Sequence, residues 1–286
     1  MNTVAFLSMD DLAGYVSDDE LAYAPLRELG WSVEAISWRD TTAQWERYAA
    51  VIVRTTWDYQ KNLPAFLEVL EAIGRKTRLA NSLEIMRWNA DKVYLREMEG
   101  RGAKIVPTLW GENITSEQQI AEWFDALNTS EIVLKPTVSA GAEDTFWLSR
   151  SSPQLSEMPD VFANRSFMVQ PFMRSVIEEG EYSLFYFHGA YSHAILKMPK
   201  PDDFRVQEEH GGDIQPFEAT AELLRAGETI LRFLNEVPLF ARVDFVRDEC
   251  SQFCLMELEL IEPSLYLRMD ADAPRRFAEA IDAFLL

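Results

Sequence analysis

The chain has 286 residues, of which 48% are hydrophobic, with 8 Trp and 17 Phe. This is enough apolar material for two or three folded domains, and it excludes a disordered chain. Lys and Arg number 27 against 47 Asp and Glu, which gives a formal net charge of -20. Such an excess argues against nucleic acid or a membrane surface as a general partner, so an anionic ligand must be met by locally placed bases.

The two cysteines, Cys250 and Cys254, lie close together around a predicted turn. No second cysteine pair is present to complete a zinc site, and the turn between them does not suggest a disulfide. The first residues lack the basic and cleavage segments of a signal peptide, and no apolar run approaches the roughly 18 residues of a membrane span. We therefore expect a cytoplasmic protein without a signal peptide or anchor.

Strand and helix patterns alternate in the first third of the chain. Strands are expected at residues 4–8, 31–37 and 49–54, with a helix at about 18–29 that Gly30 ends. This order is typical of a parallel sheet with helices on its faces.

The stretch from Arg54 to Tyr59 follows the third strand, and parallel sheets bind ligands at the carboxyl ends of their strands. The planar guanidinium of Arg54 suits a carboxylate, and Asp58 suits an ammonium group. Together they would bind a small amino-acid-like substrate. A capping and packing cluster before the next helix explains the same residues, and the sequence leaves both interpretations open.

Residues 81–88 are expected to be a connector, and a helix is expected from Asn89 to Gly100 with Lys92 in its first turn. The helix dipole disfavours a cation there, whereas an anionic ligand at the helix start would favour one. The next expected elements are a strand at 105–110, a helix at 115–127 that starts with a capping box at Thr115–Gln118, and a strand at 132–135.

Lys135 ends an apolar strand, and the small residues 137–142 follow at once. Glycine and alanine let backbone N–H groups approach a phosphate, and Lys135 could reach the same group. The sequence is not a Walker motif, and an ordinary hairpin turn remains the alternative.

Residues 167–173 are expected to form a strand that runs into a linker between two lobes. Arg205 lies in a glycine-containing polar loop and is a candidate for stabilising charge that develops during a reaction. His188 and His193 are expected to be sheet residues. The other expected elements are a strand pair at 181–188 and 191–197, a helix at 221–235 and a helix from Asp272.

Residues 241–264 are expected to form a hairpin that turns near 248–251. The period of two in a strand puts Glu257 and Glu259 on one face, with Asp244 diagonally beside Glu257. Three acids on a half-buried face repel each other unless a cation neutralises them, and oxygen ligands without His or Cys suit magnesium. The alternative is the solvated face of an edge hairpin.

The order of these residues resembles the ATP-grasp superfamily, in its glutathione synthetase-like and ribosomal-modification-like branch. The resemblance implies the following roles: Lys92 and Lys135 on the ATP phosphates, Gln170, Pro171, Phe172 and Met173 on adenine, Glu181 on ribose, Asp244, Glu257 and Glu259 on Mg²⁺, and Lys197 and Arg205 as catalytic residues at the transferred phosphate. Two positions depart from the family pattern, since many relatives carry Asn in place of Glu259 and Glu in place of Gln170.

The resemblance implies an α/β protein with the ATP-grasp fold and an N-terminal parallel-sheet domain. The expected domains are a Rossmann-like domain at 1–88, a central lobe at 89–172 and a C-terminal lobe with the metal site at 173–286. The phrases RTTWDYQKN and MELELIEPSLYL are most similar to the cyclo-ligases that act on O-ureido-D-serine and to their relatives.

The implied function is an ATP-dependent carboxylate–amine ligase that acts through an acyl phosphate on a small amino-acid-like substrate. A nucleotide-binding module without turnover and an ATP-grasp kinase are the rival interpretations. The expected cofactors are ATP and Mg²⁺. No nucleic acid or membrane partner is expected, and a homodimer is left open.

Overall fold

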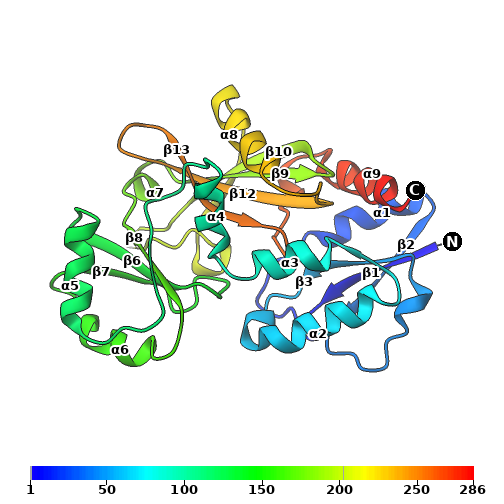
Figure 1. Cartoon of the computed structure of the whole chain (residues 1–286). Coiled ribbons are helices and arrows are strands. Elements are labelled where there is room, and N and C mark those ends of the chain that lie inside the picture. Colours follow the sequence, from blue (N-terminus) through cyan, green and yellow to red (C-terminus); the bar gives the residue numbers. More distant parts are fainter. Residues whose placement is uncertain (1, 202) are drawn as a thin grey trace.

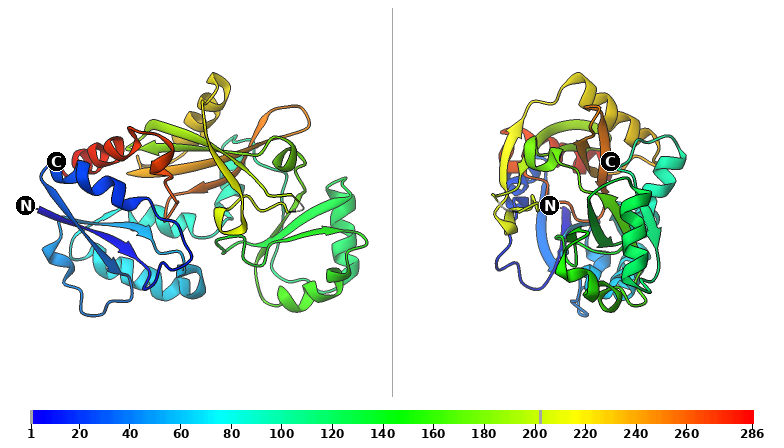
Figure 2. Two further views of the ribbon diagram at one scale, coloured as in Figure 1. Left: turned by 180° about the vertical axis from the view of Figure 1, so that it is seen from behind. Right: turned by 90° about the vertical axis from the view of Figure 1, so that its left-hand side faces the viewer.

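The computed structural model describes residues 2–201 and 203–286. Its strands form three sheets, which belong to three parts of the molecule (Figure 1). The left view of Figure 2 shows the same division, with the lobe that carries α5 and α6 at one end and the N-terminal sheet at the other.

The N-terminal sheet is parallel, with strand order β2-β1-β3-β4, as the sequence predicts. Its strands are β1 (Asn2–Ser8), β2 (Trp31–Ser37), β3 (Ala50–Thr55) and β4 (Arg78–Ala80). The connecting helices are η1 (Asp19–Ala22), α1 (Tyr23–Glu28), η2 (Trp45–Arg47), η3 (Tyr59–Asn62) and α2 (Leu63–Gly74). Every residue of β3 is buried because the sheet is covered on both faces, which explains its unbroken apolar run.

The central lobe contains an antiparallel sheet of order β5-β8-β6-β7. Its elements are β5 (Leu109–Gly111), α5 (Glu117–Ala126), β6 (Glu131–Pro136), β7 (Phe146–Ser149), η4 (Pro153–Glu157), α6 (Met158–Val161) and β8 (Phe167–Pro171). Two predicted features of this lobe differ from the structure. The strand is Leu109–Gly111 instead of 105–110, and α5 is capped by Ser116, whose hydroxyl accepts from Gln119 N, instead of by Thr115.

The C-terminal lobe is built on a five-stranded sheet of order β11-β10-β9-β12-β13. Its elements are α7 (Ser175–Glu178), β9 (Glu181–Phe187), β10 (Ala190–Met198), η5 (Glu208–His210), β11 (Asp213–Phe217), α8 (Ala221–Arg232), β12 (Phe240–Arg247), β13 (Phe253–Glu259), η6 (Leu267–Met269) and α9 (Ala273–Leu285). The predicted hairpin is present, and its two strands pair antiparallel.

Residues 81–88 are mostly helical, in contrast to the expected connector. The helix α3 (Leu83–Asn89) is capped by Ser82, and α4 (Tyr94–Gly100) follows it, so Lys92 lies between two helices and not in a first turn. This segment is fastened to β13, because Leu258 N donates to the Tyr94 hydroxyl at 2.8 Å. We propose on this packing that the central lobe begins after Val106 and not at residue 89.

Two apolar clusters join the N-terminal sheet to the C-terminal lobe. One contains Leu7 and Val53 together with Leu258, and the other contains Phe6 together with Phe240 and Phe277. The central lobe has a separate cluster drawn from residues 109–169. None of the described helices combines the length and the apolar character that crossing a bilayer requires.

Candidate active site

A cavity of about 620 Å³ lies where the three parts of the molecule meet. Its walls include Trp57 and Gln60 from the N-terminal domain, Lys135 and Phe172 from the central lobe, and the charged face of the C-terminal sheet. The cavity therefore lies beyond the carboxyl end of β3, which is where a ligand site is expected for a parallel sheet.

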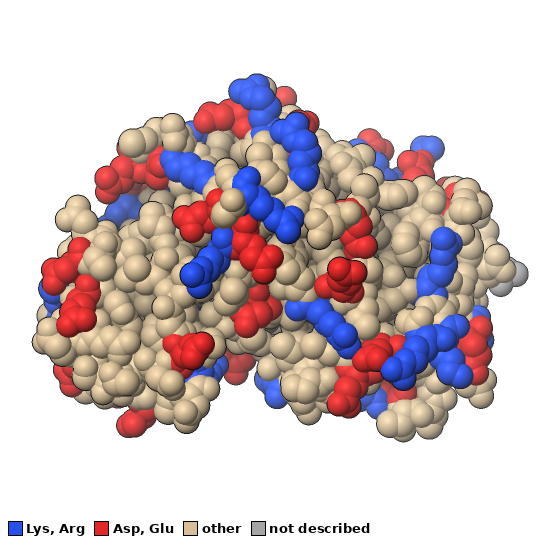
Figure 3. Space-filling view, viewed as in Figure 1, with Lys and Arg blue, Asp and Glu red and all other residues tan. Residues whose placement is uncertain are grey.

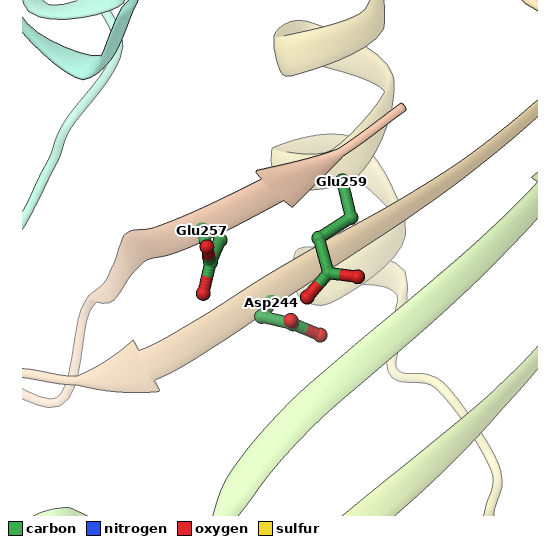
Figure 4. A group of neighbouring side chains, drawn as sticks. All are labelled: Asp244, Glu257 and Glu259. Carbon is green, nitrogen blue, oxygen red and sulfur yellow. The ribbon is translucent and has the colours of Figure 1, made fainter. Parts of the chain in front are cut away.

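The acids of the hairpin share one face of the sheet (Figure 4). Asp244 on β12 lies directly opposite Glu257 on β13, not diagonally, and a bulge follows Asp244 in the register. Among the residues that the structure describes, Asp244, Glu257 and Glu259 form the group that could hold a metal, with ligand oxygens within 4.8 Å of one another. An all-carboxylate donor set of this kind fits Mg²⁺.

Arg242 lies within this acidic group, and the sequence analysis did not identify it. Its Nε lies 3.1 Å from both carboxylate oxygens of Asp244, and its guanidinium also pairs with Glu259. The period of two could have revealed it, because Arg242 precedes Asp244 by two positions and so shares its face. The acids are thus partly neutralised by the protein itself, which weakens the argument that only a metal can relieve their repulsion.

The remaining cations reach the same acids from other elements. Lys197 Nζ on β10 lies 2.7 Å from Glu181 and 3.4 Å from Asp244, and Lys92 Nζ lies 3.2 Å from Glu257. The Ser183 hydroxyl donates to Asp244 at 2.5 Å. Every acid of the triad therefore has at least one positively charged partner.

The pKa values show how well each acid is compensated. Burial alone would raise the pKa of Asp244, but Arg242 and Lys197 outweigh it and lower that pKa. Lys92 and Lys135 do the same for the pKa of Glu257. Burial raises the pKa of Glu259 to about 7 in spite of Arg242. The negative charge of Glu259 is therefore not fully compensated by the protein, as expected of a site that receives a cation.

The two lysines predicted to hold phosphate lie near each other and near the loop that follows β6. Lys92 Nζ donates to the carbonyl of Ser139 at 2.7 Å, and Lys135 lines the same cavity. Burial lowers the pKa of Lys135, with Lys92 acting in the same direction and Glu257 opposing it. The loop also contacts the opposite wall, where His210 Nε2 lies 3.1 Å from the carbonyl of Gly141.

The linker residues Gln170, Pro171, Phe172 and Met173 also line the cavity. The Gln170 amide donates to the Thr108 hydroxyl at 3.0 Å. Phe172 stacks on Trp147 with ring centroids 4.3 Å apart, and Phe204 meets both rings edge-on. These flat apolar surfaces suit the faces of a purine.

Glu181 and Arg205, the other residues that the resemblance marks, line the cavity too. Burial raises the pKa of Glu181, although Lys197 lowers it. Arg205 forms a bidentate ion pair with Asp203, in which Nε lies 3.0 Å from one carboxylate oxygen of Asp203 and Nη2 lies 2.9 Å from the other. An anion reaching Arg205 would have to share it with Asp203.

Arg54 and Asp58 do not line this cavity, in contrast to the predicted substrate contacts. Arg54 is 1% exposed; its Nε donates to Asp19 at 3.1 Å and its Nη2 to the carbonyl of Pro263 at 2.9 Å. Asp58 accepts from Trp38 Nε1 at 2.9 Å and pairs with Arg39. The physical reason is that a buried guanidinium needs internal partners. The structure therefore favours an architectural role for both residues.

Four further residues line the cavity, of which the first two belong to the stretch 54–59 that the sequence analysis considered for the substrate and the last two were not assigned. They are Trp57, Tyr59, Gln60 and Glu262. Glu262 is 9% exposed, and burial raises its pKa well above the usual range, with Glu259 adding to the effect. Its position three residues after Glu259 was a sequence signal, since it extends the series of acids just beyond the strand.

Two family descriptions match separate parts of the chain. Residues 4–81 match the N-terminal domain of D-cycloserine synthetase DcsG, and residues 103–264 match the ATP-grasp domain of prokaryotic glutathione synthetase. The chain is also 31% identical over 271 residues to the cycloserine biosynthesis protein DcsG of Streptomyces lavendulae, an alignment that covers 89% of each chain.

Solved structures show the same fold over the whole length. The crystal structure of D-cycloserine synthetase DcsG matches with a TM-score of 0.86 at 27% identity and covers 100% of both chains. The macrocyclase MdnC from Microcystis aeruginosa MRC, bound with its precursor peptide MdnA, matches with a TM-score of 0.67 at 11% identity and covers 99% of both chains. The ATP-grasp ligase PsnB, complexed with a minimal precursor, Mg and ADP, has a TM-score of 0.66 at 15% identity, with 99% of this chain and 97% of that one covered.

Proposed function

The chain belongs to the ATP-grasp family and is an ATP-dependent ligase, and from this premise we propose that it converts the carboxyl group of a small amino-acid-like molecule into an acyl phosphate that an amine then captures. One observation carries the proposal. A single cavity brings the acids of the hairpin together with Lys92 and Lys135 and with an aromatic slot beside the linker. This arrangement has a place for a triphosphate, its metal and a purine.

ATP-grasp ligases use ATP with Mg²⁺, and we propose that Asp244, Glu257 and Glu259 hold the metal in this chain. Bound there, the metal would neutralise the negative charge of the phosphates. Lys92 and Lys135 would bind the phosphates, while Gln170 to Met173 and the ring of Phe204 would hold the base. Glu181, already paired with Lys197, would accept from the ribose hydroxyls.

The chemistry requires two displacements. A carboxylate oxygen of the substrate attacks the terminal phosphorus of ATP, the bond to the bridging oxygen breaks, and ADP leaves. A neutral nitrogen nucleophile then attacks the acyl carbon, the bond between that carbon and the phosphate oxygen breaks, phosphate leaves, and the nitrogen loses a proton to solvent as the amide bond forms. Charge compensation is the main task of the protein in such transfers, and Lys197, Arg205 and Arg242 are placed to supply it. No covalent bond to the enzyme is needed.

We further propose that the nucleophilic nitrogen belongs to the same molecule as the carboxylate and is distinct from its α-ammonium group, so that the product is a ring. The support is the likeness over nearly the whole chain to D-cycloserine synthetase. The macrocyclase and peptide-bound ligases share the fold at identities of 11–16%, which carries no argument about substrate.

The test is incubation with ATP, Mg²⁺ and either O-ureido-D-serine or a panel of amino acids, with ADP, phosphate and the organic product measured. We expect ADP and phosphate in equal amounts, together with a cyclic product that derives from a single substrate molecule. Release of neither would leave only a nucleotide-binding module, and ADP without phosphate would identify a kinase. A product that joins two molecules would overturn the ring closure alone.

We propose a small molecule, and not a nucleic acid or a membrane, as the partner of this site. Figure 3 shows basic and acidic side chains interspersed on one face of the molecule, which gives a polyanion no continuous basic surface there. A cytoplasmic location is proposed on the chemistry of Cys250 and Cys254, which are both free thiols.

A further inference from the structure

Glu262 differs from the four paired acids of the cavity in having no partner among the residues that the structure describes. Asp244 and Glu259 pair with Arg242, Glu257 pairs with Lys92, and Glu181 pairs with Lys197. The Glu262 carboxylate makes no hydrogen bond or ion pair with any residue that the structure describes, although 91% of the residue is buried. A buried acid without a donor is costly unless a ligand supplies one.

The backbone of Glu262 is fixed against the N-terminal domain. Trp57 Nε1 donates to the Glu262 carbonyl at 2.8 Å, and the Gln60 amide donates to the Trp57 carbonyl at 3.3 Å. The second contact uses the nitrogen of Gln60, so its oxygen Oε1 is left buried without a partner among the described residues. Glu262 and Gln60 thus both line one cavity, and each carries an acceptor without a partner among the described residues.

Aromatic rings line the same cavity as Glu262 and Gln60. Tyr15 and Trp57 line the cavity with ring centroids 5.3 Å apart. Tyr59 also lies close by, since burial and then the charge of Glu262 raise its pKa well above the usual value. Acceptors that lack donors, next to electron-rich ring faces, are the surroundings that a primary ammonium group requires.

We propose that Glu262 and Gln60, beside the rings of Tyr15 and Trp57, form the subsite for the ammonium group of the substrate. This inference rests on the proposed function and names the class of molecule that the site accepts. In this proposal Glu262 takes the role of ammonium partner that the sequence analysis gave to Asp58. Asp58 is already paired with Trp38 and Arg39.

The chain also limits the size of the substrate. Glu262 follows Glu259 by three residues, so their Cα atoms are separated by at most roughly 10 Å. The ammonium subsite is therefore close to the acids that the phosphate chemistry uses. This closeness suits an amino acid that carries its ammonium and reacting carboxyl groups in one small molecule.

The experiment compares O-ureido-D-serine with its analogue that carries hydrogen in place of the α-ammonium group. In the unmodified enzyme, kcat/KM for phosphate release should be on the order of 10²-fold higher for the amino acid, as loss of a charge-assisted contact requires. In Glu262→Gln this ratio should fall to nearly one, while the Kd for ATP stays unchanged. Glu209→Gln makes the same charge change on an exposed residue of the cavity rim and should keep the ratio.

Each outcome separates the two proposals. Phosphate release with neither of these molecules nor with any member of the amino-acid panel in the unmodified enzyme would overturn the proposed function, and this subsite with it. An active enzyme whose ratio survives in Glu262→Gln would overturn the subsite alone. If Glu262→Gln does not fold, Gln60→Met gives the same comparison, because it removes the second acceptor. A ratio that Gln60→Met leaves unchanged would also overturn the subsite.

Discussion

The hairpin of β12 and β13 and the loop from Arg54 to Lys61 meet at the same cavity but use their charges differently. On the hairpin, Arg242 and the three acids face the cavity and compensate each other there. In the loop, Arg54 and Asp58 turn away from it and hold parts of the chain together. The loop presents aromatic and amide groups to the cavity, together with the exposed Lys61. A charged side chain beside a cavity can thus either bind a ligand or hold parts of the chain together. The packing around it determines which.

The largest expected effect comes from removing the architectural charge. Arg54→Ala should lower the free energy of unfolding by about 3–5 kcal/mol, because it leaves Asp19 buried without its cation. Urea unfolding at neutral pH measures this. The surface variant Arg39→Ala should cost no more than about 1 kcal/mol, since that pair is partly exposed. A stable Arg54→Ala protein with a raised KM for substrate would return Arg54 to the substrate site.

The hairpin should respond through activity and not through stability. Glu257→Gln should lower kcat by a factor on the order of 10²–10³ and weaken binding of MgATP, because it removes a carboxylate that we propose binds the metal. Asp58→Asn, the matched change in the loop, should leave kcat within about threefold. Steady-state kinetics with thermal melting of both variants checks this. Full activity in Glu257→Gln would remove the acids from the metal site.

Lys135 tests the phosphate side of the cavity. Lys135→Met should raise the Kd for ATP on the order of 10-fold or more, since a charge-assisted contact contributes about 1.5–3 kcal/mol. Adenosine should bind almost as before, because it lacks the phosphates. Calorimetric titration of both ligands gives the answer, with Lys104→Met as the control at the exposed pair with Asp248. Equal losses for the two ligands would mean that Lys135 supports the fold.

The smallest effect is a pH dependence that belongs to neither region. Burial lowers the pKa of His193 to about 4, with Asp270 opposing and Arg276 adding to the shift. An unfolded His with a pKa of about 6.5 binds its proton first, so stability should be constant above that pH and fall as the pH drops toward 4. The loss from pH 7.5 to 5 should be about 1–2 kcal/mol smaller in His193→Gln. The exposed His188→Gln should show the full loss, and identical curves for all three proteins would contradict the assignment.

Particular residues show what the sequence could predict. The shared face of Glu257 and Glu259 follows from the period of two, and the strand that ends at Lys135 follows from its apolar run. The role of Arg54 could not be predicted, because its partner Pro263 lies 209 positions away and is brought there by tertiary packing. Which acids receive Arg242 depends on the register and bulge of the hairpin. The short helix α3 was missed because seven residues give too few turns for a clear periodic pattern.

The separate apolar cluster of the central lobe has a consequence for folding as well as for ligand entry. Its residues, from Leu109 to Val169, pack on one another, whereas the N-terminal sheet and the C-terminal lobe share two clusters. Met168 of β8 and Trp110 of β5 reach one of the shared clusters, but most apolar side chains of the central lobe do not, so we expect two cooperative units and not three. The central lobe should open and exchange its amide hydrogens as one unit, while the other two parts protect theirs together. Such partial opening would expose the nucleotide end of the cavity while leaving the wall formed by Trp57 and Glu262 intact.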